Sequence, residues 1–221
     1  MDIKVIITGA TGLVGEGVLF ECLEHPDVKE ILIVGRKPYT GKKHEKLKEC
    51  IVPDFFNLES FKEQLNGYDA CLYCAGISSR GMNEQDYSRV TFDTPMHFAD
   101  TLLKLNAQMV FSHVSGGHSD SSETGKIMWA RVKGKTENAL LRLPFKSVYN
   151  FRPGFMKPTN GQKNIKNYYK IISRMYPVLR LLLPGQVCTM QEVGLAMINS
   201  VLKGYPKHIL EIDDIKRLAK Q

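Results

Sequence analysis

The sequence has no hydrophobic run long enough to cross a membrane. Its longest apolar stretch near the C-terminal end, residues 176–184, is interrupted by Pro177 and Arg180, whereas a transmembrane helix needs about 20 predominantly apolar residues. Met1-Asp2 leads directly into an apolar segment, without the charged and hydrophobic regions of a secretory signal. These absences predict a cytoplasmic protein.

Cysteine is scarce, and its pattern fits no disulfide or metal framework. The five cysteines are an odd number, which is typical of a reducing compartment. Cys71 and Cys74 form a C-x-x-C sequence, but they fall within an expected buried strand, where residues three apart face opposite sides. No second cysteine or histidine pair has zinc spacing, and Ser115 lacks the G-x-S-x-G context of serine hydrolases. The sequence therefore argues against dithiol redox, zinc and serine-hydrolase chemistry.

Concentrated positive charge is also missing, although the formal net charge is +7 and the sequence pI is about 9.1. The basic residues are spread along the chain, and the densest runs, 42–43 and 216–217, fall short of a basic block. This distribution argues against nucleic acid as a partner. A phosphate-rich small ligand accounts for part of the positive excess.

Short apolar runs alternate with helical patterns over the first 151 residues. Strands are expected at 3–8, 31–34, 50–52, 70–75, 109–114 and 147–151, and helices at 13–23, 58–65, 84–105 and 127–143. This alternation predicts βαβ units. Right-handed crossovers then favour an α/β fold with a doubly wound parallel sheet, a Rossmann fold with the strand order 3-2-1-4-5-6.

No linker, low-complexity tract or repeat divides the 221 residues, so we expect a single domain. Residues 1–155 form its expected dinucleotide-binding core, and residues 156–221 a small substrate-side cap with C-terminal helices. Apolar and basic residues alternate in the stretch formed by Tyr168, Tyr169 and 171–183. It is best interpreted as cap or core, with a membrane surface or a dimer contact as alternatives. A homodimer is thus left open.

A glycine-rich loop follows the first expected strand and opens the first helix. Its glycines have the spacing G-x-x-G-x-x-G, and the expected cofactor-binding residues are Thr8, Gly9, Thr11, Gly12, Leu13, Val14 and Gly15. The first glycine permits a tight turn, the second a close approach of the pyrophosphate, and the third close packing of helix on strand. The helix N-terminus then offers unpaired N–H groups to the phosphates. This combination predicts dinucleotide binding.

The end of the second expected strand indicates which dinucleotide binds. An acidic residue there would bond the ribose hydroxyls of NAD, but the sequence has Arg36 and Lys37. A guanidinium can pair with a 2′-phosphate and lie against adenine, so NADP is favoured over NAD, with a solvated loop as the alternative. Asp54 and Phe55 are placed to flank the adenine, and Cys74-Ala75-Gly76 to lie against the ribose.

With these motifs in place, the chain resembles the short-chain dehydrogenase/reductase superfamily over nearly its whole length. Within this superfamily, the run from Trp129 to Glu137 is similar to the atypical Tat-interactive oxidoreductase-like group. Bacterial members of that group are described as NAD-dependent epimerase/dehydratase-like. The superfamily's catalytic set is Ser, Tyr and Lys, with Tyr four residues before Lys. The resemblance assigns the serine to Ser115 and the lysine, which also holds the nicotinamide ribose, to Lys133. It further places Pro153 and Gly154 at the cofactor.

The tyrosine position is occupied by Trp129, and this departure bears on activity. An indole N–H donates a hydrogen bond but does not give up its proton at neutral pH. Lys133 itself, His118 or His113 can take over proton transfer, although His113 lies within the fifth expected strand and is better interpreted as structural. Alternatively, the site binds its cofactor without turnover. The sequence therefore favours an NADP(H)-dependent oxidoreductase acting on a carbonyl or sugar-nucleotide substrate. The alternative is a non-catalytic NADP(H)-binding redox sensor or scaffold. The expected pocket lining is Arg80, Ser115, His118, Phe155 and Met156.

Overall fold

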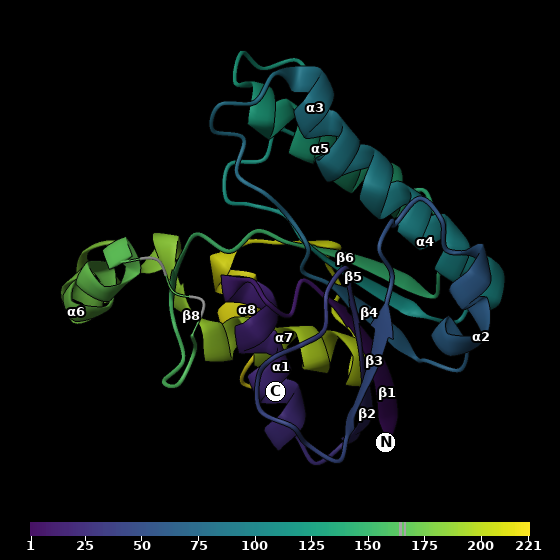
Figure 1. Cartoon of the computed structure of the whole chain (residues 1–221). Coiled ribbons are helices and arrows are strands. Elements are labelled where there is room, and N and C mark those ends of the chain that lie inside the picture. Colours follow the sequence, from purple (N-terminus) through teal and green to yellow (C-terminus); the bar gives the residue numbers. More distant parts are fainter. Residues whose placement is uncertain (164, 166) are drawn as a thin grey trace.

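A parallel sheet of seven strands forms the centre of the molecule, and the computed structural model describes residues 1–163, 165 and 167–221 (Figure 1). The strands are β1 (Ile3–Thr8), β2 (Val28–Gly35), β3 (Leu47–Ile51), β4 (Ala70–Tyr73), β5 (Val110–Val114), β6 (Ser147–Phe151) and β9 (Ile209–Leu210). Their order is β3-β2-β1-β4-β5-β6-β9. The predicted doubly wound order is confirmed, and β9 adds a strand beside β6.

Helices cover both faces of the sheet (Figure 1). One face carries α1 (Leu13–Glu24), α7 (Met190–Leu202) and α8 (Ile212–Leu218), whose apolar residues share a core cluster with β1 and β2. The other face carries α2 (Lys62–Leu65), with the short 3-10 helix η1 (Glu59–Phe61) before it, α4 (Thr94–Leu105) and α5 (Met128–Leu141). The β-branched residues of β1 are fully buried between these layers, as a central parallel strand requires.

The long helix expected at 84–105 is interrupted. It consists of α3 (Glu84–Ser88), a π-helical turn (Arg89–Asp93) and α4. The hydroxyl of Thr94 donates a hydrogen bond of 2.9 Å to the carbonyl oxygen of Arg89, five residues earlier. Such π-helical turns insert one residue into a helix and are frequent at functional sites.

A second, two-stranded sheet lies beyond the carboxyl end of β6. It pairs β7 (Phe155–Lys157) with β8 (Val187–Thr189), and between them come α6 (Asn167–Leu182) and the 3-10 helix η3 (Pro184–Gln186). In Figure 1, α6 stands apart from the central sheet, whereas α7 and α8 pack on it. The side chains of Tyr168 and Tyr169 lie outside the part of the chain that the structure describes. None of the described helices combines the length and apolar character needed to cross a bilayer.

Candidate functional site

The glycine loop makes a tight turn between β1 and α1. The N–H of Gly12 donates a hydrogen bond of 2.8 Å to the carbonyl oxygen of Gly9, and Gly9 has φ +71°, a conformation that other residues rarely adopt. A Cβ on Gly9 would lie 2.7 Å from the backbone nitrogen of Ala75, and one on Gly15 would overlap the Gly9 carbonyl. The roles predicted for the first and third glycines therefore have a steric basis.

The N-terminus of α1 is open. Gly12 is its N-cap, and no side chain caps the helix, so the first N–H groups of the helix have no internal partner. A Cβ on Gly12 would lie 3.3 Å from the carbonyl oxygen of Gly9, within the space where a ligand phosphate would approach. This cradle of glycines and free N–H groups fits a pyrophosphate.

Thr8 has a different role from the rest of the loop. Its side chain is fully buried, and its hydroxyl accepts hydrogen bonds of 3.1 Å from the N–H groups of Cys74 and Ala75. The hydroxyl thus ties the end of β1 to the end of β4. It fixes the geometry of the edge on which a cofactor would lie.

The residues expected at the adenosine end gather around β2 and β3. Val34 pairs with Thr8 across the sheet, so the exposed Arg36 and Lys37 follow beside the glycine loop. Asp54 is exposed and accepts a hydrogen bond of 3.0 Å from the N–H of Phe56. Phe55 packs on the ring of Phe98 at 5.4 Å between centroids, which directs it toward the core. Gly76 has open space where a Cβ would be.

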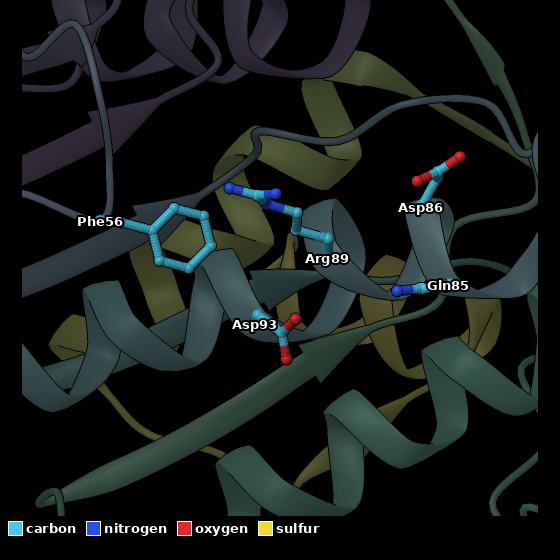
Figure 2. A pocket seen from close by; sticks show the side chains of 5 residues that line it. All are labelled: Phe56, Gln85, Asp86, Arg89 and Asp93. Atoms are coloured by element: carbon cyan, nitrogen blue, oxygen red, sulfur yellow. The ribbon is translucent and has the colours of Figure 1, made fainter.

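A cavity of about 430 Å³ adjoins the adenosine end of the expected cofactor site, and it was not predicted from the sequence. It is lined by Phe56, Gln85, Asp86, Arg89 and Asp93. Figure 2 shows the Arg89 side chain directed toward the Phe56 ring, with the guanidinium carbon 5.6 Å from the ring centroid. The four-residue spacing of Gln85, Arg89 and Asp93 was the available signal, but the π-helical turn alters the helical face they share.

Ser115 lies directly after β5 and is buried. Its hydroxyl is 2.9 Å from that of Ser119, which donates its proton to the carbonyl oxygen of Gly116, also at 2.9 Å. A hydroxyl has one proton, so Ser115 donates to Ser119. Ser119 thereby holds the Ser115 side chain in place, a role that sequence reasoning did not identify.

Lys133 lies in α5, one turn after the partly buried Trp129. A Cβ on Gly116 would be 3.6 Å from Cδ and Cε of Lys133, so the lysine stem runs along the backbone next to Ser115. Burial lowers the pKa of Lys133, and the weaker attraction of Glu137 opposes this shift. Within the described residues, the ammonium group has no hydrogen-bond or ion-pair partner. The structure thus brings Ser115 and Lys133 together.

Glu137 has a stronger partner than Lys133. Its carboxylate is fully buried and accepts hydrogen bonds from both Nε and Nη2 of Arg152, with Nε at 3.0 Å from Oε1. Nη1 of Arg152 reaches Glu211 at 3.1 Å, and Nη2 reaches the hydroxyl of Ser121 at 2.6 Å. This network joins α5, the loop after β5 and the start of α8.

The two candidate histidines differ in their surroundings. His113 is buried in β5, and its Nδ1 is 2.9 Å from Oδ1 of Asn150. Burial, together with the charge of Lys133, lowers the pKa of His113 to about 3, so the ring is neutral at physiological pH. His118 is exposed, with φ +68°, on the loop after β5.

Acid is expected to destabilise the protein through His113. The unfolded state takes up a proton near pH 6.5, while the folded state does so near pH 3, so stability falls as the pH drops between these values, by at most about 1.4 kcal/mol per pH unit. Replacing His113 with asparagine, whose amide can still donate to Asn150, should flatten this slope. Urea denaturation at pH 7, 6, 5 and 4 measures it, and identical slopes for both proteins would contradict the assignment.

A cavity of about 670 Å³ opens at the carboxyl ends of β5 and β6. Its lining residues are Gly117, His118, Arg152, Pro153, Gly154, Phe155, Gly185, Gln186, Glu211 and Ile212. Of the residues expected to line a pocket, His118 and Phe155 do so, whereas Ser115 does not. Met156 is instead buried in the core, and Arg80 is exposed on the loop after β4. Pro153 and Gly154 line this cavity together with Gly117, whose N–H donates to the carbonyl oxygen of Pro153 at 3.2 Å.

Comparison with known families gives the geometry a context. The family model described as "NAD dependent epimerase/dehydratase family" matches residues 5–123. The chain belongs to this family. The match covers β1 to β5 and the glycine loop, and it confirms the resemblance inferred from the sequence motifs. Its members share the nucleotide-binding, oxidoreductase-like fold.

Two curated proteins are similar to this member of the family. "Leucinostatins biosynthesis cluster protein T" of Purpureocillium lilacinum is 28% identical over 143 residues, which are 63% of this chain and 51% of the relative. "Protein HTATIP2" of Rattus norvegicus is 27% identical over 155 residues, 69% of this chain and 62% of the relative. The alignments thus span about half to three-fifths of these relatives.

Solved structures with the same fold are more distant in sequence. WbmF of Bordetella bronchiseptica in complex with NAD⁺ has a TM-score of 0.66 and 12% identity, over 98% of this chain and 77% of that one. MoeE5 in complex with UDP-glucose and NAD has a TM-score of 0.67 and 15% identity, over 98% and 80%. UDP-glucose 4-epimerase of Thermotoga maritima has a TM-score of 0.66 and 12% identity, over 99% and 82%. At these identities the likeness establishes the fold.

Proposed function

We propose that the chain is an NADP(H)-dependent oxidoreductase that acts on the carbonyl group, or the corresponding alcohol, of a small molecule. The observation that carries the proposal is the position of the Lys133 side chain against Gly116, directly after Ser115. The next residue, Gly117, lines the cavity of about 670 Å³. Pockets of this size are typical of small-molecule sites. In an open α/β sheet, ligands bind beyond the carboxyl ends of the strands, which is where the cavity and the glycine loop lie.

The cofactor would be held by the cradle at the N-terminus of α1. Gly9 and Gly15 permit the tight turn and its close packing, and Gly12 leaves room for the pyrophosphate. Arg36 pairs with a 2′-phosphate, and the backbone of Ala75 and Gly76 lies along the ribose. When bound, the nicotinamide supplies or accepts the hydride. The neighbours that bind NAD support dinucleotide binding, and Arg36 is the reason for preferring NADP.

Ser115 and Lys133 would supply the other two functions, polarisation of the substrate oxygen and proton transfer to or from it. When a substrate binds, the Ser115 hydroxyl turns its proton from Ser119 to the substrate oxygen and polarises the carbonyl, and the Ser119 hydroxyl can then turn from Gly116 to donate to Ser115. Lys133 gives that oxygen a proton during reduction, or removes one during oxidation. A lysine suits this role when burial brings its pKa closer to neutrality, and Lys133 has that direction of shift. Substrates carrying a ketone, an aldehyde or a sugar-nucleotide hydroxyl meet these requirements.

The second candidate function is a non-catalytic NADP(H)-binding redox sensor or scaffold. Trp129 in the position of the superfamily's tyrosine favours it, because an indole N–H is too weakly acidic to act as a general acid at neutral pH. The two functions differ in a direct measurement. An oxidoreductase consumes NADPH across a panel of ketones, aldehydes and sugar nucleotides, whereas the sensor binds NADPH without consuming it.

NADPH is expected to stabilise the protein more than NADH does. At a ligand concentration of 100 Kd the gain is about 2.7 kcal/mol, or roughly 5–10 °C in melting temperature for a chain of this size. Replacing Arg36 with alanine should weaken NADPH binding by about tenfold to hundredfold, as expected for the loss of charge-assisted hydrogen bonds, and leave NADH binding unchanged. Thermal shift with NADP, NADPH, NAD and NADH measures both effects.

The matched control for this experiment is Lys42→Ala, which removes one exposed positive charge beyond the same loop. Its NADPH affinity should equal that of the wild type. Equal stabilisation of the wild type by NADH and NADPH would overturn the preference for NADP. Absence of a shift with all four nucleotides would overturn cofactor binding itself.

A further inference from the structure

Helix α6 presents a strongly apolar surface to solvent. The exposed fractions are 50% for Met175, 55% for Val178, 81% for Leu181, 68% for Leu182 and 43% for Leu183. Met175, Val178 and Leu182 are spaced by three and four residues and so form one stripe along the helix. We call these five residues the α6 apolar face. Such contiguous patches mark interaction sites more often than isolated exposed leucines do.

The opposite side of α6 is the one that packs on the protein. Tyr176 is buried, with 5% exposure, and Nζ of Lys157 in β7 lies 5.4 Å from the centroid of its ring. The helix contacts β7, β8 and η3. The α6 apolar face is therefore oriented away from the small sheet that supports the helix.

The chain segment that carries this face has charges of one sign. Residues 155–186 contain six basic residues and no acidic one, although the whole chain has 23 acidic residues. Arg174 and Arg180 are both exposed on α6, and neither forms an ion pair within the described part of the chain. An exposed apolar stripe on a helix that also carries unpaired cations is typical of helices that lie in the interface of an anionic membrane.

Two other occupants fit less well. A second copy of the chain would bring two basic surfaces together, and their like charges would repel. A substrate-covering role would require the face to border the cavity, but the cavity is lined by Gly185 and Gln186 of η3 and by no residue of 175–183. The α6 apolar face therefore forms no part of the cavity wall.

We propose that the α6 apolar face docks the protein on the surface of a membrane that contains anionic lipids. The helix lies in the plane of the interface, with Met175, Val178 and Leu182 among the upper acyl chains and Arg174 and Arg180 at the headgroups. Docking at this face leaves the sheet and both of its helical layers outside the bilayer. It is a peripheral attachment, independent of the proposed oxidoreductase chemistry.

Vesicle co-sedimentation of the full chain tests the proposal. We expect binding to vesicles of phosphatidylcholine with one quarter phosphatidylglycerol, at least tenfold weaker binding to pure phosphatidylcholine, and weaker binding at 0.5 M salt. The double variant Leu181→Ser/Leu182→Ser should lose binding to anionic vesicles by at least tenfold, because both side chains are exposed and leave the interior packing intact. Arg174→Glu/Arg180→Glu should have a similar effect.

Matched controls distinguish binding through the α6 apolar face from nonspecific hydrophobic adsorption and from an effect of net charge. Ile127→Ser removes an isoleucine with 57% exposure elsewhere, and Lys42→Glu/Lys43→Glu gives the same change in net charge away from α6. Both should bind as the wild type does. Failure to bind anionic vesicles, or equal loss in the controls, would overturn the proposal. Self-association that the leucine variant abolishes, without vesicle binding, would instead assign the face to a second copy of the chain.

Discussion

Replacing Lys133 with alanine is expected to lower NADPH-dependent turnover by about 10²- to 10⁴-fold, the usual contribution of a general acid or base. The reason is that neither Trp129 nor His113 can substitute for it. The indole N–H of Trp129 is too weakly acidic to transfer its proton at neutral pH, and burial keeps His113 neutral and bonded to Asn150. Steady-state kinetics on the best substrate from the carbonyl panel, at saturating NADPH, measures the loss.

Companion variants distinguish proton transfer from a merely structural role. Lys133→Arg should remain inactive, because a guanidinium stays protonated and cannot return the proton. Trp129→Phe should keep turnover within about tenfold, since the indole takes no part in proton transfer. The thermal shift with NADPH should persist in Lys133→Ala. Unchanged turnover in this variant, or a loss explained by cofactor affinity alone, would contradict the role given to Lys133.

The direction of the pH dependence follows from the same residue. Burial lowers the pKa of Lys133 below its ordinary value of 10.5, so the amine loses its proton at a lower pH than a free lysine does. Carbonyl reduction needs the protonated form and should slow as the pH rises through this pKa. Alcohol oxidation needs the neutral amine and should quicken over the same range.

The central fold could be predicted from the sequence because its signals are local. Buried β-branched runs such as 3–8 identify strands, and the glycine spacing from Gly9 to Gly15 is dictated by contacts within a single turn. Strand order then follows from the handedness of the crossovers. Even β3, whose exposed Lys48 and Glu49 obscure its pattern, was displaced by only a few residues from the predicted 50–52.

Features that depend on distant contacts could not be predicted in this way. β7 and β8 have three residues each and are stabilised by pairing with one another across 29 intervening residues, so neither has a periodic pattern of its own. The partnership of Glu137 with Arg152 likewise joins α5 to the end of β6. Sequence reasoning assigned Lys133 and Ser115 to one site, but it could not show which group neutralises Glu137.

The second prediction with a large expected effect concerns the ion pair between Glu137 and Arg152. Replacing Arg152 with alanine is expected to lower the free energy of unfolding by about 3–5 kcal/mol, the usual result of leaving one member of a buried ion pair without its partner. Glu137 is fully buried, and the Arg152 side chain is only 11% exposed. Urea denaturation at pH 7 measures the loss.

The matched control is Arg131→Ala, which removes another arginine that pairs with a glutamate. Its partner Glu84 has a side chain that is 52% exposed, and surface pairs contribute about 0–1 kcal/mol. Adding Glu137→Gln to Arg152→Ala should restore part of the stability, because the buried charge is then gone. A cost for Arg152→Ala no larger than that for Arg131→Ala would refute the importance of the buried pair.

Arg152 is also expected to influence the pKa of Lys133 through Glu137. Glu137 is one helical turn after Lys133, a spacing at which opposite charges attract, but Arg152 holds its carboxylate. Without Arg152, the free carboxylate should raise the pKa of Lys133 and move the pH profile of turnover to higher pH. The double variant Glu137→Gln/Arg152→Ala should lack this upward shift, because its amide carries no charge. A purely structural Arg152 would lower stability and leave the pH profiles of all three proteins superimposable.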